Sequence, residues 1–226
     1  MKLLRTFIIF AVLWTVCLWG AQAHADLLQS LFNTGVDGTG APLRAGSTDP
    51  HYYVTMVTSA PVTPFSAYIT QGGWPLNGPW VSNTASAQWI GPIASIGGYA
   101  GDGDFRYRTT FDLTSYNPST TVISGQWSSD NAGMQIYLNG KATNIVHPGE
   151  FAYQGWELFT ITSGFKQGVN TLDFYINNLP NGTINPTGLI VQMKGTAEPV
   201  PILGAIWLFA PALLGLIELK RRYLLG

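Results

Sequence analysis

The residues of this chain best suited to chemistry are a few carboxylates in glycine-rich stretches. Asp102 and Asp104 flank a single glycine. Carboxylates on such a loop could ligate calcium, with Asp37 or Asp130 as further ligands, although a turn capped by its own Asp side chains has the same pattern. Two acids could also flank a glycosidic bond, but spacing this close favours a solvated turn or an ion site.

A second group of residues could bind sugar. Trp127 is followed by Asp130-Asn131, which falls between two expected strands. A tryptophan can cover the apolar face of a sugar ring, while carboxylate and amide groups take its hydroxyls. The same pattern also fits a core tryptophan followed by a plain turn, so both interpretations stay open. The wider pool of aromatic candidates is Trp74, Trp80, Tyr137 and Trp156.

The sequence contains few groups that could serve catalysis, and we predict that the protein is not an enzyme. His51 and His147 show no zinc-ligand spacing, and no Gly-x-Ser-x-Gly or phosphate-loop motif occurs. The single cysteine, Cys17, lies in an N-terminal apolar segment. If that segment is removed, the mature chain can form neither a disulfide nor a thiolate site. We expect no cofactor other than a possible calcium ion.

The charge of the central region argues against nucleic acid as a partner. Residues 26–198 carry six Lys or Arg and eleven Asp or Glu, which gives a net charge of −5. No Lys/Arg cluster stands among them, whereas proteins that bind nucleic acid need a basic surface for the phosphates.

The pattern of apolar residues predicts an all-β sandwich. Short runs of alternating or β-branched residues separated by glycine, proline and asparagine are typical of strands joined by turns. We expect strands at 52–58, 65–70, 79–82, 87–90, 105–112, 121–127, 134–138, 157–162, 171–177 and 188–193. No long stretch of this region has helical periodicity.

Alternation also predicts which side chains face the core. In 105–112 the inward set is Phe105, Tyr107, Thr109 and Phe111, and the arginines and Asp112 face outward. In the later strands the expected inward sets are Ile123, Gly125 and Trp127, then Met134, Ile136 and Leu138, then Leu172, Phe174 and Ile176, and last Leu189, Val191 and Met193. Asn139-Gly140 predicts a tight hairpin turn.

Three motifs in order resemble the galactose-binding-domain-like jelly roll. They are Tyr-Arg-Thr-Thr-Phe-Asp-Leu at 107–113, Ser-Ser-Asp-Asn-Ala-Gly-Met-Gln-Ile-Tyr-Leu-Asn-Gly at 128–140, and Phe-Lys-Gln-Gly-Val-Asn-Thr-Leu-Asp-Phe at 165–174. The resemblance spans roughly residues 104–193 and implies a jelly-roll β-sandwich. Members of that family include sugar-binding modules and purely structural domains, so the fold alone does not decide the function.

Residues 1–25 are predicted to be a secretory signal peptide. Lys2 and Arg5 precede an apolar segment at 7–19, and small residues at 21, 23 and 25 offer a cleavage site. An uncleaved anchor is the alternative. We therefore expect an exported protein whose domain spans residues 26–195.

The C-terminal residues 196–226 contain a short acidic-proline motif at 197–201, an apolar run over 201–219 and the basic residues Lys220, Arg221 and Arg222. The run is long enough for a short transmembrane helix, and the basic residues should stay in the cytoplasm. A plain tail anchor or a buried helix would share these features. Ala197, Glu198 and Pro199, followed by this helix and basic cluster, resemble the PEP-CTERM sorting signal of exported bacterial proteins.

That resemblance implies an exosortase-type membrane protease as a partner and a Gram-negative envelope as the setting. We expect an inner-membrane-anchored precursor that is sorted to the cell surface or the extracellular matrix. The expected role is structural or adhesive, in the envelope or a biofilm. The alternative is a carbohydrate-binding module for exopolysaccharide, with or without the help of calcium.

Overall fold

Alternating apolar residues form the long strands of this chain. The computed structural model describes residues 24–95, 100–182, 185–200 and 220–221. The strands within these ranges are β1 (Asp26–Leu27), β2 (Thr48–Val57), β3 (Ala60–Ile69), β4 (Ile90–Gly91), β5 (Gly103–Asp112), β6 (Val122–Asp130), β7 (Ala132–Leu138), β8 (Lys141–Ala142), β9 (Glu157–Ile161), β10 (Val169–Asn178) and β11 (Gly188–Ala197). Two single-turn helices, η1 (Pro118–Thr120) and η2 (Ala152–Gln154), lie between strands.

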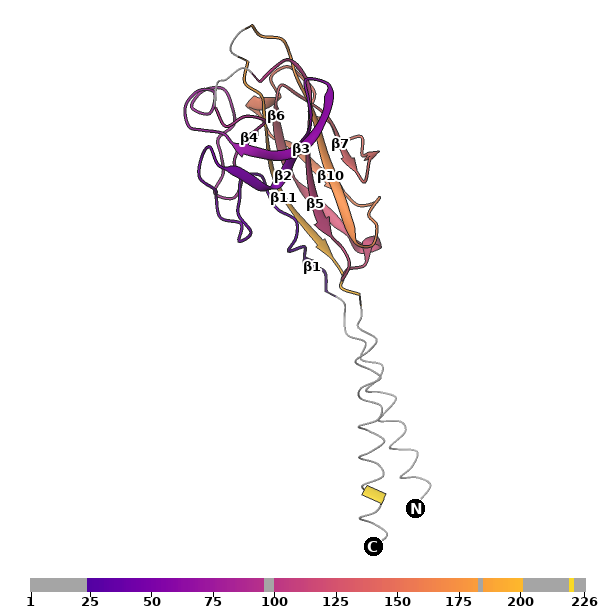
Figure 1. Cartoon of the computed structure of the whole chain (residues 1–226). Coiled ribbons are helices and arrows are strands. Elements are labelled where there is room, and N and C mark those ends of the chain that lie inside the picture. Colours follow the sequence, from indigo (N-terminus) through magenta and orange to yellow (C-terminus); the bar gives the residue numbers. More distant parts are fainter. Residues whose placement is uncertain (1–23, 96–99, 183–184, 201–219, 222–226) are drawn as a thin grey trace.

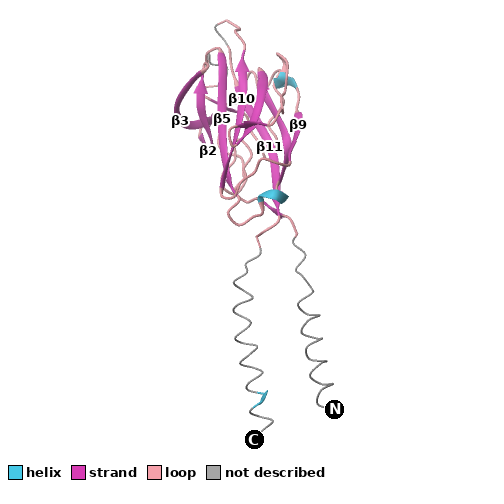
Figure 2. Ribbon diagram, turned by 90° about the vertical axis from the view of Figure 1, so that its right-hand side faces the viewer, coloured by secondary structure: helices cyan, strands magenta, loops and turns pink. Residues whose placement is uncertain are grey.

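The strands form one antiparallel ladder that folds back on itself into two layers (Figures 1 and 2). Its order is β8-β7-β10-β5-β2-β3-β4-β11-β6-β9, and β1 pairs with β11. Aromatic rings from the two halves meet inside: the rings of Trp127 (β6) and Phe159 (β9) lie 5.7 and 6.4 Å from that of Phe174 (β10). The predicted all-β sandwich is thereby confirmed.

Strand β5 shows the predicted alternation most clearly. Phe105, Tyr107 and Thr109 are fully buried, and Phe111 is 1% exposed. The inward apolar residues expected on β6, β10 and β11 are also buried, among them Ile123, Leu172, Phe174, Ile176, Leu189, Val191 and Met193.

Met134 is an exception to the predicted faces. Its side chain is 46% exposed, whereas Ile136 and Leu138 are buried as expected. The cause is a bulge: Gln135 pairs with Tyr175 and Gly133 pairs with Ile176, so Met134 has no partner on β10. An extra residue on one strand reverses the alternation before it, and Gly133 takes the inward position.

The strands predicted at 79–82 and 87–90 are wrong except for the last residue, because only Ile90–Gly91 joins the ladder. The rest is a loop whose tryptophans pack on the outside of β11. The ring centroids of Trp80 and Trp89 lie 4.1 Å apart, and both residues pack with Ile190 in a second apolar cluster. Trp89 is held by loop groups, with its backbone N–H donating to Asn83 Oδ1 and its Nε1 donating to the carbonyl of Val81.

The hairpin predicted at Asn139-Gly140 is confirmed. Both residues have positive φ angles, 52° and 78°, as a tight turn of this kind requires. Leu138 and Lys141 pair directly across it.

The two described ends of the domain lie side by side at one end of the sandwich (Figure 1). Asp26 pairs with Ala197 at the end of β11. Beyond it the chain stays attached: the N–H of Glu198 donates to Thr120 Oγ1 at 2.9 Å, and Pro199 forms a β-bridge with Tyr116. Ordered pairing thus continues past residue 195, the predicted end of the domain, into the acidic-proline motif.

The predicted signal peptide and the apolar run at 201–219 fall almost wholly outside the described residues. Lys220 and Arg221 are exposed, and Arg222 is not described. In the part of the chain that the structure describes, no helix has the length and apolarity needed to cross a membrane.

Candidate functional site

Trp127 occupies the core and not a binding surface. Its side chain is fully buried, with its ring against Phe174 and beside His147. Gly133 lies directly against it, since a Cβ at that position would stand 2.4 Å from Trp127 Cη2. The core interpretation of Trp127 therefore holds, and its ring is not available to an external sugar.

Asp130 is also buried, with 5% of its surface exposed. Its Oδ2 accepts a hydrogen bond from Trp80 Nε1 at 2.9 Å, and its backbone carbonyl accepts one from Thr187 Oγ1. Burial raises the pKa of the Asp130 carboxyl to about 7, because the charged form loses its hydration, and the bond from Trp80 only partly opposes this. Asp130 thus joins loops that are distant in sequence.

Asn131 connects a further pair of loops. Its Nδ2 donates to the carbonyl of Glu150 at 3.0 Å, and its Oδ1 accepts from the N–H of Leu179 at 2.8 Å. With both amide atoms engaged by backbone groups, Asn131 stabilises this end of the sandwich. Trp127 thus fills the core, while Asp130 and Asn131 hold loop groups at this end of the sandwich.

The two carboxylates of the candidate calcium pair belong to separate hydrogen-bond groups. Asp102 Oδ1 accepts from Asn185 Nδ2 at 2.8 Å. Asp104 accepts from the Tyr175 hydroxyl at 2.5 Å and from Asn177 Nδ2 at 2.7 Å. Asp37 accepts from its own turn, at Thr39 and Ala41. Among the described residues, no three His, Cys, Asp or Glu side chains gather as metal ligands.

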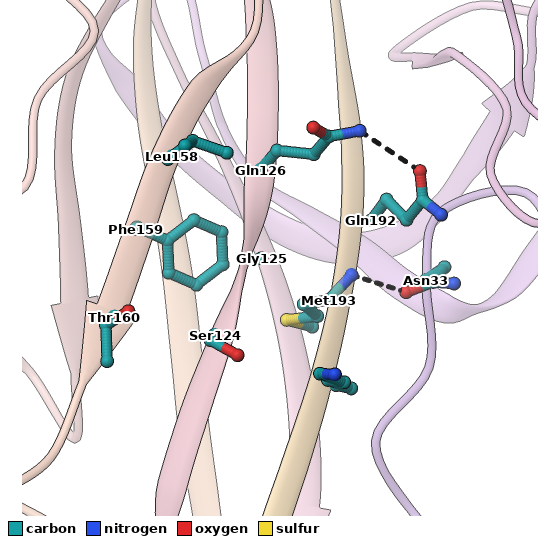
Figure 3. A pocket seen from close by; sticks show the side chains of 10 residues that line it. Asn33, Ser124, Gly125, Gln126, Leu158, Phe159, Thr160, Gln192 and Met193 are labelled. Carbon is teal, nitrogen blue, oxygen red and sulfur yellow. Dashed lines mark hydrogen bonds between the residues drawn. The ribbon is translucent and has the colours of Figure 1, made fainter.

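A groove of about 600 Å³ lies on the outer face of β9, β6 and β11 (Figure 3). Strand register sets six side chains in two rows across these strands: Leu158, Gln126 and Gln192 in one row, and Thr160, Ser124 and Lys194 in the next. Because side chains alternate along a strand, all six point to the same outer face. We call this surface the amide groove.

The amides of the groove are held in a chain of hydrogen bonds. Gln126 Nε2 donates to Gln192 Oε1 at 3.2 Å, and Gln192 Nε2 donates to Ser86 Oγ at 3.0 Å. Asn33 forms the side wall, with its Oδ1 accepting from the N–H of Met193 at 2.7 Å (Figure 3). Leu158 adds an aliphatic surface that is 74% exposed. The groove therefore combines oriented neutral polar groups with one apolar patch.

The charge of the groove is low. Of its ten lining residues only Lys194 is ionisable, and none is Asp, Glu, His or Cys. General acid–base catalysis needs a titratable group within hydrogen-bond reach of the substrate. The groove is suited to binding a neutral polar molecule and offers no acid/base pair for bond cleavage.

The opposite layer carries a different surface on the outer face of β5, β10 and β7. Arg108 forms a bidentate pair with Asp173, with distances of 2.6 and 2.8 Å. The guanidinium carbon of Arg106 lies 5.7 and 5.3 Å from the ring centroids of Tyr137 and Tyr175. We call this surface the arginine–tyrosine face.

The remaining aromatic candidates are dispersed. Trp80 is buried in the second apolar cluster, with Trp89 and Ile190. Trp156 is partly buried and packs against this cluster. Trp74 is 51% exposed on the loop after β3. Of the pool named from the sequence, only Tyr137 belongs to one of the two outer surfaces.

No family model and no curated protein matches this chain. Among solved structures it is similar to a family 35 carbohydrate-binding module from Clostridium thermocellum, with 12% identity, a TM-score of 0.32, and coverage of 58% of this chain and 88% of that one. A CBM35 from Paenibacillus barcinonensis has 16% identity and a TM-score of 0.28, with 50% and 83% covered. A β-glucosidase from Kluyveromyces marxianus, solved with glucose, has 12% identity and a TM-score of 0.36, with 80% of this chain and 19% of the enzyme covered. At these values the likenesses carry no inference about a ligand.

Proposed function

We propose that this protein is a non-catalytic carbohydrate-binding protein whose amide groove holds a neutral saccharide. The observation that carries the proposal is the set of neutral amide and hydroxyl groups that strand register aligns beside the exposed Leu158. Gln126 and Gln192 are the central pair.

The groups in the groove suit a polyol. Each amide has both donors and an acceptor, so neighbouring hydroxyls of one sugar can bind the same side chain. Leu158 can cover the apolar face of a ring. A volume of about 600 Å³ falls in the usual range for small-ligand sites. Because the groove is open and polar, we expect a dissociation constant of about micromolar to millimolar.

The proposed setting is the cell surface or extracellular matrix. The N-terminal charged and apolar segments support export, and the apolar run and basic cluster support a membrane-anchored precursor processed by an exosortase-type protease. In that setting, saccharide binding would give the protein an adhesive role toward exopolysaccharide.

Calorimetry with the full-length protein tests the binding proposal. The protein is held in micelles of a zwitterionic detergent, because a glycoside detergent would compete for the site. Neutral oligosaccharides from purified exopolysaccharide are the titrants. The double variant Gln126→Ala/Gln192→Ala should weaken binding at least tenfold, since each lost hydrogen bond costs about 0.5–1.5 kcal/mol.

The matched control is Gln71→Ala, which removes an exposed glutamine on the loop after β3. It should bind as the parent does. If no neutral saccharide gives heat with the folded parent protein, or if the double variant and the control bind equally well, the amide groove is not a saccharide site.

Tail processing needs its own measurement. The intact mass of the mature protein is compared between cells with and without the sorting protease. Loss of residues 220–226 only when the protease is present would support processing. Their retention in both strains would mean a permanent anchor.

A further inference from the structure

We propose that the arginine–tyrosine face is a second binding site, one that takes the carboxylate of an acidic sugar through Arg106. This second site is separate from the amide groove. Its central group is a cation that is fixed in place, flanked by aromatic rings and without an ion pair among the described residues.

Arg106 is oriented by its surroundings. The Tyr137 and Tyr175 rings stand nearly perpendicular to each other, at 84° with centroids 6.4 Å apart, and the guanidinium lies over both. A guanidinium stacked on aromatic rings loses little freedom when it binds, and its planar edge matches a carboxylate in a bidentate contact. Arg106 is half-buried, so the face it presents to ligand is restricted.

The charge of Arg106 is unpaired within the described residues. The ion pair found there joins Arg108 to Asp173, and the carboxylate nearest in register to Arg106, Asp104, is already bound by Tyr175 and Asn177. The two internal segments that are not described, 96–99 and 183–184, contain no Asp or Glu. A ligand could therefore supply the missing anion.

Two buried polar atoms on this face also lack partners. Arg106 Nε is a donor without an acceptor, and Gln135 Oε1 is an acceptor without a donor. The two residues flank Tyr175 in the register, Arg106 on β5 and Gln135 on β7. Both atoms are shielded from solvent, so a ligand would meet the terminal nitrogens of Arg106 and not these two atoms.

These features favour a carboxylated sugar over a phosphate or sulfate ester. The tyrosine rings offer apolar surface to a sugar ring. Asp104 and Asp173 lie on the same face and would repel a phosphate, which carries about −1.5 to −2 charge, more than they repel a single carboxylate. The ligand is thus an acidic sugar with one charge per ring.

The test is calorimetry of the full-length protein with oligogalacturonate and with its fully methyl-esterified, neutral form. We expect the parent to bind the acid at least tenfold more tightly than the ester. Arg106→Gln should remove this preference, and Arg106→Lys, which keeps the charge but not the planar fork, should reduce it. Arg44→Gln, at an exposed arginine in the loop before β2, should change nothing.

Two further measurements distinguish binding at this site from binding in the amide groove. Gln126→Ala/Gln192→Ala should leave acid binding intact, and Arg106→Gln should leave neutral saccharide binding intact, with both variants shown to be folded by circular dichroism. The proposal is overturned if the acid and the ester bind equally well, or if a sulfated sugar binds more tightly than the carboxylated one. It is also overturned if Arg44→Gln and Arg106→Lys lower the affinity for the acid by the same factor.

Discussion

The buried carboxyl of Asp130 should make the stability of this protein depend on pH in an unusual direction. In the fold its pKa is raised to about 7, while in the unfolded chain it lies near 3.8. Between these values the folded protein keeps a proton that the unfolded chain releases. Stability from this group is therefore fully present below about pH 4 and is lost as pH rises through about 7.

The size of the effect follows from the shift of about three pKa units. At about 1.36 kcal/mol per unit, Asp130 removes up to about 4 kcal/mol from the free energy of unfolding between pH 4 and pH 8. Asp130→Asn removes the titration while its amide oxygen can still accept from Trp80 Nε1. We expect the variant to be more stable than the parent at pH 8 and to lose that advantage at pH 4.

The assay is guanidinium unfolding of parent and Asp130→Asn at pH 4, 6 and 8, followed by tryptophan fluorescence. Other groups titrate in this range. The pKa of Asp49 is raised by burial, which acts in the same direction, and the pKa of His147 is lowered by burial, which gives stability that rises with pH. Both are present in both proteins, so the difference between the curves isolates Asp130. A difference that does not change from pH 4 to pH 8 would mean that the Asp130 carboxyl does not titrate with a raised pKa in the folded protein.

Unfolding experiments test three further features. Phe111→Ala should destabilise by about 3–5 kcal/mol, and the neighbouring exposed Thr110→Ala should be nearly neutral; equal losses would contradict the register of β5. Gly133→Ala should cost about 1–3 kcal/mol, because the new Cβ meets Trp127, and an unchanged midpoint would mean that this contact relaxes freely. Met134→Ser, on the exposed bulge, should change stability by no more than about 0.5 kcal/mol, and a core-sized loss would place Met134 inside.

The strands and their inward faces could be predicted because they depend on local pattern. A period of two along 105–112 is enough to place Phe105 and Phe111 inside, and Asn139-Gly140 is enough to place a turn. The bulge at Met134 could not be predicted this way. Where an extra residue enters one strand depends on the partner strand, which a local pattern does not contain.

The sequence also contains a sign of the second apolar cluster, but the alternation of apolar and polar residues does not reveal it. Leu189, Ile190 and Val191 are consecutive apolar residues, which is typical of a strand buried on both faces. The loop with Trp80 and Trp89 supplies the cover over Ile190. Together, the three apolar residues at 189–191 and the tryptophan-rich loop favour packing of the Trp80 and Trp89 rings against the sheet over sugar binding by them.

The amide groove could not be found from the sequence. Gln126, Leu158 and Gln192 are separated by more than thirty residues from one another and become neighbours only through the pairing of β9 with β6 and of β6 with β11. Cross-strand register is set by tertiary structure, so isolated glutamines in separate strands give no local sign of a shared site.

Saccharide binding in the amide groove is tested most directly by following the side-chain amide resonances of Gln126 and Gln192 by NMR while a neutral oligosaccharide is added to the full-length protein. We expect these two amide signals and that of Asn33 to shift in a saturable way, while the side-chain amide of Gln71 does not move. Saturable binding that leaves the groove amides unshifted and moves signals elsewhere would contradict this expectation.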